Sequence, residues 1–459
     1  MGTLLLACVL ASQSYAQTTF FKLADTTTSI PGGSGTFTDF KTPISDVDRA
    51  IFYGEGTAGQ MGYYQYDGTT STKLVDRNTA VPEGAGNFTN LSFFAYGVDT
   101  NFVFAGTDAG GMKGLFQLAG TTLTKLGNTN TAAPGSGGNF SNFLGPAVAG
   151  NSLALLADGP GSYRGAFRHS GGTFTRLVDT ATPFPGGPGN LNFSGQLAFD
   201  GTAAAFFAFD SVSFTGGIFS HANNTLTSLA TTNTVMPGFA NRFSSFQSPP
   251  ALSGGTVVFI GQDTVPTPAV RGIFAVPVGG GTLTALVTTA TAIPGGTSGN
   301  FSFFNGFAYD NGALVFAANN SSGVHGLYKL QGGTLKTLLA GGGLLDGKTF
   351  TSLAINSTGF RHGIVGFRVS FTDGSKGVFA ADIGQTAEAF LGITSYLSAS
   401  GATVSFTGEV SRAYRLQYST TLLLGSWTTL TNFTYTAPVS VADTSAAGQA
   451  KRFYRAVSP

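Results

Sequence analysis

A motif that recurs along most of the chain constrains the fold more than any other feature. Seven copies can be aligned: TTTSIPGGSGTF (26–37), RNTAVPEGAGNF (77–88), TNTAAPGSGGNF (129–140), TATPFPGGPGNL (180–191), TTNTVMPGFANRF (231–243), TATAIPGGTSGNF (289–301) and a divergent GGGLLDGKTF (341–350). The anchor positions Pro31, Pro82, Pro134, Pro185, Pro237, Pro294 and Asp346 recur about every 52 residues, a period typical of repeat architectures. The motif therefore predicts seven similar structural units.

Each unit contains four strand-like runs. In the second unit these are residues 88–98, 102–106, 114–118 and 122–126, which are rich in Phe, Val, Leu and Thr. Gly, Asn and Asp separate them, which is the chemistry of strands joined by tight turns. Seven units of four antiparallel strands predict an all-β chain that forms a seven-bladed β-propeller.

The count of outer strands predicts how the ring closes. Six units carry their own fourth strand, but the last unit (350–382) does not, whereas the strand-like run 20–25 precedes the first motif. We expect this N-terminal strand to complete the last blade, because that pairing covers two otherwise open sheet edges. The propeller is then expected to span residues 17–386.

The periodicity stops near Glu388, and residues 387–459 alternate in the manner of half-buried strands. This tail predicts a small C-terminal β-sandwich of immunoglobulin or fibronectin III type. Trp427 is the only tryptophan, and we expect it to fill the core of this sandwich.

Residues 1–16 have the features of a secretory signal peptide. An apolar run from Leu4 to Ala11 leads to the small-x-small pattern at Ser14–Ala16, although no basic residue precedes the run. The alternative is a first buried strand. Export predicts a secreted, extracellular or cell-surface protein, and the run is too short to span a membrane. Cys8 is the only cysteine, so cleavage after Ala16 would exclude disulfides, thiolate metal sites and cysteine catalysis.

Charge and motif content argue against several functions. Only 10% of residues are charged and the net charge is +1, which gives no case for nucleic acid or an anionic membrane surface. No G-x-S-x-G motif occurs, the four histidines fall in different units, and the strands expected to line the channel contribute Asp39 but few other acids. We therefore predict no catalytic residues, no cofactor and a monomer.

The loop between the second and third strands carries a repeated charge pattern. Acidic residues open it at Glu55, Asp108, Asp158, Asp210, Asp263 and Asp373, and basic residues close it at Lys113, Arg164, Arg271, His325 and Lys376. One interpretation is structural: each acid caps its own turn and pairs with the base across the hairpin mouth. The other is a charged rim that binds a polar polymer, a partner or Ca²⁺. No loop has the dense D-x-D-x-D spacing of a calcium site, so no metal is predicted.

The motif itself is expected to be architectural. Asp25, Asp76, Asn128 and Asp179 precede Thr-rich stretches and should cap turns through side-chain hydrogen bonds. The aromatic residues that end the motif should pack in the core; they are Phe37, Phe88, Phe140, Phe243, Phe301 and Phe350.

The repeat resembles a known group of sequences. The pattern D-T-x-T-x-P-G-G-x-G-N-F, followed by V-x-F and G-[IL]-[FY] strands, is similar over residues 20–385 to repeats of secreted bacterial proteins of uncharacterised function. The closing YRLQYST, GSWTTL and FYRAVSP segments are similar to C-terminal modules of large secreted proteins of environmental bacteria. Both resemblances imply export, and the first implies a propeller. Neither implies catalytic residues, and the seventh motif departs by losing its Pro and its Thr run.

Three functions remain open from the sequence. The first is a secreted, non-catalytic module that binds a polysaccharide or an extracellular protein. The second is an extracellular polysaccharide-active hydrolase or lyase whose site lies in the propeller channel. The third is a structural component of the envelope or matrix. A propeller fold accommodates both binding and catalysis, so the fold does not choose between them.

Overall fold

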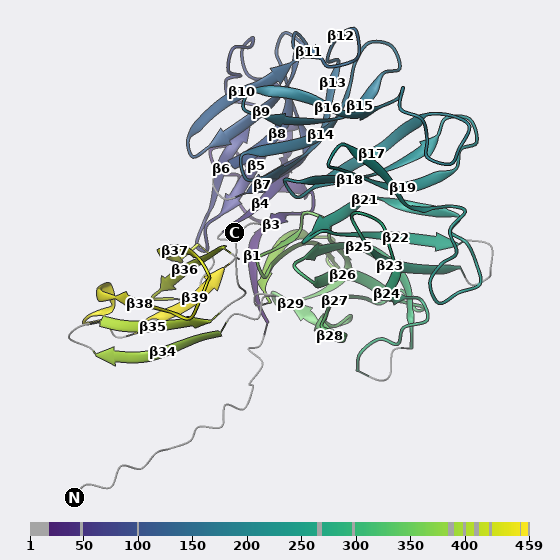
Figure 1. Ribbon diagram of the computed structural model, residues 1–459. Coiled ribbons are helices and arrows are strands. Elements are labelled where there is room, and N and C mark those ends of the chain that lie inside the picture. Colours follow the sequence, from purple (N-terminus) through teal and green to yellow (C-terminus); the bar gives the residue numbers. More distant parts are fainter. Residues whose placement is uncertain are drawn as a thin grey trace, which may run out of the picture.

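The computed structural model describes residues 18–45, 49–98, 101–263, 269–295, 299–383, 390–397, 401–407, 413–421, 425–449 and 451–457. Strands dominate these residues, and the helical elements among them are the two short 3₁₀ turns η1 (Thr57–Gly59) and η2 (Thr444–Ala446). The expectation of an all-β chain is therefore confirmed (Figure 1).

Six antiparallel sheets follow one another along the described chain, each with its strands in sequence order. The first sheet is β2 (Phe37–Phe40), β4 (Ala50–Gly56), β5 (Met61–Tyr66) and β6 (Ser71–Asp76), with β3 (Ile44–Ser45) on β4, and the second is β7 (Phe88–Val98), β8 (Asn101–Asp108), β9 (Lys113–Ala119) and β10 (Thr122–Asn128). The third sheet is β13 (Asn142–Ala149), β14 (Ser152–Asp158), β15 (Arg164–Ser170) and β16 (Thr173–Asp179), and the fourth is β17 (Leu191–Phe199), β18 (Ala203–Asp210), β19 (Gly216–Ala222) and β20 (Thr225–Thr231). The fifth sheet is β21 (Ser245–Ser253), β22 (Thr256–Asp263), β23 (Val270–Pro277) and β24 (Thr284–Thr288), and the sixth is β25 (Phe301–Asp310), β26 (Ala313–Asn320), β27 (His325–Gln331) and β28 (Thr334–Leu339). A two-residue pair, β11 (Ala132–Ala133) and β12 (Gly138–Asn139), lies within the third motif.

The seventh sheet combines the N-terminal strand with strands from residues 344–382. Its strands are β30 (Lys348–Ala354), β32 (Ile364–Phe371), β33 (Lys376–Asp382) and the N-terminal strand β1 (Thr19–Asp25), with β29 (Leu344–Leu345) and β31 (Phe360–Arg361) attached. β1 runs antiparallel to β33, with Thr19 opposite Asp382 and Asp25 opposite Gly377. Figure 1 shows the purple N-terminal strand beside the green strands of this sheet. This is the pairing that the count of outer strands predicts.

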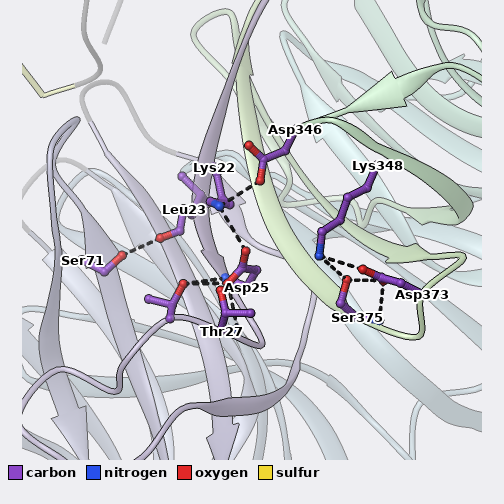
Figure 2. A network of polar contacts seen from close by, with 10 residues as sticks. Lys22, Leu23, Asp25, Thr27, Ser71, Asp346, Lys348, Asp373 and Ser375 are labelled. Atoms are coloured by element: carbon purple, nitrogen blue, oxygen red, sulfur yellow. Dashed lines mark hydrogen bonds and ion pairs between the residues drawn. The ribbon is translucent and has the colours of Figure 1, made fainter.

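Polar contacts join β1 to the strands on either side of it (Figure 2). Lys22 Nζ lies 2.8 Å from Asp346 Oδ2 in the seventh motif and 3.1 Å from Asp25 Oδ2. On the other side, the Ser71 hydroxyl of β6 donates to the Leu23 carbonyl at 2.7 Å. The divergent residue Asp346 thus contacts the closing strand where the other motifs have proline.

The first strands of consecutive sheets lie next to one another. β7 contacts β13, β13 contacts β17, β17 contacts β21, β21 contacts β25, and β25 contacts β30 and β31. β3 of the first sheet contacts both β7 and β31, so the order returns to its start. The first strands therefore surround a common axis, and the later strands of each sheet lie farther out (Figure 1).

The aromatic residue that ends each motif packs in the core, as the sequence predicts. Phe88 is 2% exposed and meets the Phe116 ring edge-on at a centroid distance of 5.0 Å. A Cβ at Gly106 would lie 2.8 Å from the Phe88 ring, so glycine is needed opposite it. The same burial is found at Phe37, Phe140, Phe243, Phe301 and Phe350.

The start of the motif is a turn held by reciprocal hydrogen bonds. The Asp76 amide donates to Thr79 Oγ1 at 3.0 Å, and Asp76 Oδ1 accepts from the Asn78 amide at 3.1 Å and from the Thr79 hydroxyl at 2.9 Å. The predicted capping role is confirmed here and at Asp25, Asn128 and Asp179. These bonds satisfy the polar groups of the turn without any ligand.

The seventh sheet differs from the others between its first and second strands. Residues 355–363 intervene there, whereas β13 and β14 are joined by residues 150–151. Within this segment the carbonyls of Thr358 and Gly359 accept hydrogen bonds from the Ser45 amide and hydroxyl at 3.1 and 2.9 Å. Farther along it, contacts reach the second and sixth sheets: Arg361 Nη1 donates to Tyr96 Oη at 3.3 Å, and the His362 amide donates to Asp310 Oδ2 at 2.9 Å. The segment therefore bridges the first, second and sixth sheets, and we call it the crossing segment.

The C-terminal region contains two three-stranded sheets. One is β34 (Phe390–Leu397), β35 (Gly401–Thr407) and β38 (Val439–Asp443); the other is β37 (Thr428–Thr434), β36 (Ala413–Ser419) and β39 (Phe453–Val457). Their buried core is Val404, Phe406, Tyr414, Leu416, Tyr435 and Ala456. The prediction that Trp427 fills this core is wrong: Trp427 is only half-buried, and the Arg455 guanidinium lies 4.4 Å from its ring centroid. Stacking on a cation lets the indole remain partly exposed.

Candidate functional site

The charged residues predicted from the loop pattern do lie along one edge of the sheets. The acids fall at or near the ends of second strands and the basic residues at the starts of third strands, with Asp373 in the turn between β32 and β33. The motifs lie along the same edge, because Asp108 and Asp210 bond to them directly. We call this edge the motif face.

Asp108, Asp210 and Asp263 do not form part of an exposed rim, so that expectation is wrong for these three residues. They are 2%, 0% and 5% exposed. Asp108 accepts from the Ala85 amide of the second motif and the Met112 amide of its own loop, both at 2.8 Å.

The other two buried acids also fix a motif in place. Asp210 accepts from the Gly189 amide of the fourth motif at 3.1 Å and from the Val212 and Ser213 amides of its own loop at 2.7 and 3.0 Å. Asp263 accepts from the side-chain amide of Asn241 at 2.8 Å. The turn-capping interpretation is therefore confirmed for Asp108 and Asp210, and each acid also holds the preceding motif against its sheet.

The hydrogen bonds set the ionisation of these carboxyls. Burial opposes ionisation of Asp108 and Asp210, but backbone N–H donors outweigh it and lower the pKa of each. The Gly-rich stretch of the motif follows from the same geometry. A Cβ at Gly187 would lie 1.9 Å from Asp210 Oδ2, so only glycine permits this approach.

The basic residues mostly reach away from their own loops. Arg164 is the exception that also pairs as predicted: its Nε lies 2.6 Å from Asp158 Oδ1 across the hairpin mouth. Arg164 Nη1 additionally donates to the Phe193 carbonyl of the next sheet at 3.2 Å. Arg271 lies over the Phe303 ring of the next sheet, 4.3 Å from its centroid, and burial lowers its pKa. These two side chains therefore join neighbouring sheets.

Two further members of the series, His325 and Asp373, are held by polar side chains. His325 Nδ1 lies 3.2 Å from the Asn305 side-chain amide in the same sheet, and burial lowers its pKa. Asp373 is held by the Ser375 hydroxyl at 2.5 Å and by Lys348 Nζ at 2.9 Å (Figure 2). These two bonds lower its pKa.

An ion-pair network that the sequence pattern missed lies between the seventh and first sheets. Asp39 Oδ1 is 2.7 Å from Arg368 and 3.1 Å from Lys376, and Asp39 Oδ2 is 3.8 Å from Lys41. Lys41 also lies 3.4 Å from Glu55. Burial opposes ionisation of Asp39, but Lys376 and Arg368 outweigh it and lower its pKa. Asp39 was singled out as a channel acid, but two of its cations, Arg368 and Lys376, come from sequence positions more than 300 residues away, which no local pattern could reveal.

A groove of about 510 Å³ opens on the motif face over the first three sheets. Glu55 and Lys113 of the predicted series line it, together with Lys41, Tyr53 and Asn90. Lys113 is exposed. Burial raises the pKa of Tyr53 to about 12, so it remains a neutral hydroxyl at ordinary pH. The groove thus combines two lysines and one carboxylate with amide and aromatic groups.

The described residues show no group of three or more His, Cys, Asp or Glu side chains that could hold a metal ion. His169 and His221 lie near the far ends of β15 and β19, whereas His325 begins β27 on the motif face. Among these same residues no helix is long and apolar enough to cross a membrane.

Sheet order and contacts define the class of the protein: it is an all-β chain of β-propeller type. A family of unknown function, DUF7453, matches residues 161–360. No curated protein matches the chain.

The chain is similar to several solved structures. One is the β-propeller domain of the Trilobed protease from Pyrococcus furiosus, with 9% identity, a TM-score of 0.46, and 76% of this chain and 96% of that chain covered. A prolyl endopeptidase has 12% identity and a TM-score of 0.45 over 84% of this chain, which spans only 54% of the endopeptidase. The polysaccharide lyase Uly1 has 12% identity and a TM-score of 0.42, with 80% of this chain and 98% of that chain covered.

Proposed function

We propose that the chain is a secreted, closed seven-bladed propeller followed by a β-sandwich at residues 387–459, and that it is a non-catalytic binding module. The sheet count, the pairing of β1 with β33 and the two C-terminal sheets support the architecture. Export rests on residues 1–16, which lie outside the described residues. N-terminal sequencing of protein recovered from the medium tests it, because a chain that begins at Met1 there would contradict cleavage.

The proposed ligand is an anionic polymer that lies in the groove on the motif face, with an acidic polysaccharide as the first candidate and an acidic segment of an extracellular protein as the second. One observation carries this proposal: the acids of this face are engaged inside the fold or in ion pairs, and the groove is lined by two lysines, Lys41 and Lys113, against one acid, Glu55, which lies 3.4 Å from Lys41. Asp108 and Asp210 bind backbone amides, and Asp39 is surrounded by Lys41, Arg368 and Lys376. Exposed Lys113 adds a further positive charge to the groove wall.

The same observation weighs against hydrolysis on this face. A glycosidase needs two carboxyl groups that flank the scissile bond, about 5–10 Å apart. Asp39 and Glu55 each lie within 4 Å of a lysine. A charge reversal in the groove is therefore expected to change binding and not a reaction rate.

The direct test is retention on an immobilised acidic polysaccharide, with a neutral polysaccharide of similar length as comparison. Lys113→Glu should weaken retention at least about tenfold, because it replaces an attractive charge with a repulsive one. Lys336→Glu makes the same change on the exposed outer strand β28 and should leave retention unaltered. Retention should also fall as salt rises. Equal loss in both variants, or equal retention on the neutral polymer, would reject the groove.

A further inference from the structure

A second cavity lies on the axis at the edge opposite the motif face. Its volume is about 180 Å³. It is lined by the ends of first strands, including Ala149 of β13, Phe199 of β17, Ser253 of β21 and Asp310 of β25. Residues 357–358 and 360–362 of the crossing segment line it as well. We propose that this axial cavity is a binding site for a single sugar ring.

The polar groups of the cavity come from several sheets and are held in place. The carboxylate of Asp310, which is 8% exposed, accepts from the Ser253 hydroxyl at 3.0 Å through Oδ1 and from the His362 amide at 2.9 Å through Oδ2. A carboxylate offers about four lone-pair positions, so the Ser253 and His362 donors leave capacity for ligand hydroxyls. Asp310 thus joins the fifth, sixth and seventh sheets at the cavity wall.

The crossing segment adds a cation and a strained residue. Arg361 lines the cavity and donates through Nη1 to Tyr96 Oη at 3.3 Å. His362 has a φ of +49°, a left-handed conformation that is uncommon and strained for a residue other than glycine. Asp310 holds that backbone by its hydrogen bond to the His362 amide, so the strain is maintained at the cavity wall.

This set of groups matches the chemistry of a sugar ring. A carboxylate accepts from hydroxyl groups, a guanidinium donates to hydroxyl and ring oxygens, and charged partners strengthen both kinds of bond. Tyr96 and Tyr309 supply aromatic surface for the apolar face of a ring. The volume is below the roughly 300–1,000 Å³ of drug-sized ligand sites, which limits the occupant to about one ring.

The axial cavity is separate from the proposed groove, because the two are lined by different residues. The groove is lined by the starts of first strands, such as Asn90 and Asn142, and the cavity by the ends of first strands. Substitutions at one site should therefore leave binding at the other unchanged, and failure of either proposal can be recognised by itself.

The test uses saturation-transfer NMR and calorimetry with methyl pyranosides of glucose, galactose and mannose, and with glucuronate, at millimolar concentrations. At least one of these probes should bind the full chain. Arg361→Gln and Asp310→Asn should each weaken that binding at least about tenfold, because each removes a charged hydrogen-bonding partner. Lys336→Glu, on the exposed outer strand β28, should leave it unchanged.

Thermal melting identifies a variant that fails to fold, and a structure with the bound probe then locates the site without any substitution. The proposal is overturned if no probe binds the wild-type chain, if the bound sugar lies outside the cavity, or if folded variants bind as tightly as the wild type.

Discussion

The fourth sheet and the seventh sheet use similar strands but are held by different contacts. In the fourth sheet, Asp210 binds amides of its own loop and of the motif that leads into the sheet. In the seventh sheet, the closing strand is bound through Lys22, whose partner Asp346 lies 324 residues away, and both of those side chains are about 40% exposed. The carboxylate contact that holds the motif in the repeat is thus local and buried, whereas the ion pair at the closing strand is long-range and exposed.

The largest expected effect comes from removing the closing strand. Deletion of residues 1–25 exposes the edge of β33 and the buried partners of Leu23, so the free energy of unfolding should fall by on the order of 5 kcal/mol or more. Denaturant unfolding measures this loss. A synthetic peptide of residues 18–26 should restore part of the stability, and a scrambled peptide should not. Unfolding identical to that of the intact chain would show that β1 does not close the sheet.

The next prediction compares a buried carboxylate in the fourth sheet, Asp210, with a half-exposed one in the seventh, Asp373. Asp210→Ala leaves the amides of Gly189, Val212 and Ser213 without their acceptor, and should lower Tm by roughly 5 °C. Asp373→Ala removes a half-exposed carboxylate in the seventh sheet and should change Tm by only about 1 °C. Calorimetric melting of both variants measures the difference, and equal shifts would contradict the contrast between the sheets.

A smaller effect tests why the motif needs glycine. Gly187→Ala places a Cβ 1.9 Å from Asp210 Oδ2 and should destabilise the chain by about 2 kcal/mol. The matched control is Gly279→Ala, because no atom lies within 4 Å of the new Cβ there. Its free energy of unfolding should stay within about 0.5 kcal/mol of the wild type. If Gly187→Ala changes the free energy of unfolding as little as the control does, Asp210 does not hold the motif as closely as the contacts indicate.

The smallest effect concerns the closing ion pair. A double-mutant cycle of Lys22→Ala and Asp346→Ala should give a coupling of about 0.5 kcal/mol or less, because both side chains are exposed. Lowering the pH should also reduce the stability of the closing strand, because it protonates Asp25. Burial opposes ionisation of Asp25, but bonds from Thr27 and Lys22 outweigh it and lower its pKa to about 2. Its contribution is present above the ordinary value near 4 and is lost as pH falls from about 4 to about 2.

Periodic features and the strand pairing that follows from them could be predicted from the sequence, whereas side-chain contacts between distant residues could not. The strand count, the pairing of the N-terminal strand and the capping at Asp76 follow from spacing and turn chemistry. The partners of Asp39 could not be predicted, since Arg368 and Lys376 reach it only after the first and last sheets meet. The position of Trp427 was mispredicted because composition does not reveal that Arg455 lies over its ring.

The crossing segment at residues 355–363 also limits how a polymer can use the molecule. Thr358 and Gly359 are bonded to the first sheet, Arg361 to the second and His362 to the sixth, so the segment is fixed where it lines the axial cavity. We therefore expect that a linear chain does not thread from one face to the other along this axis. Any long ligand must enter and leave by the same face, so release requires lateral detachment and not translocation.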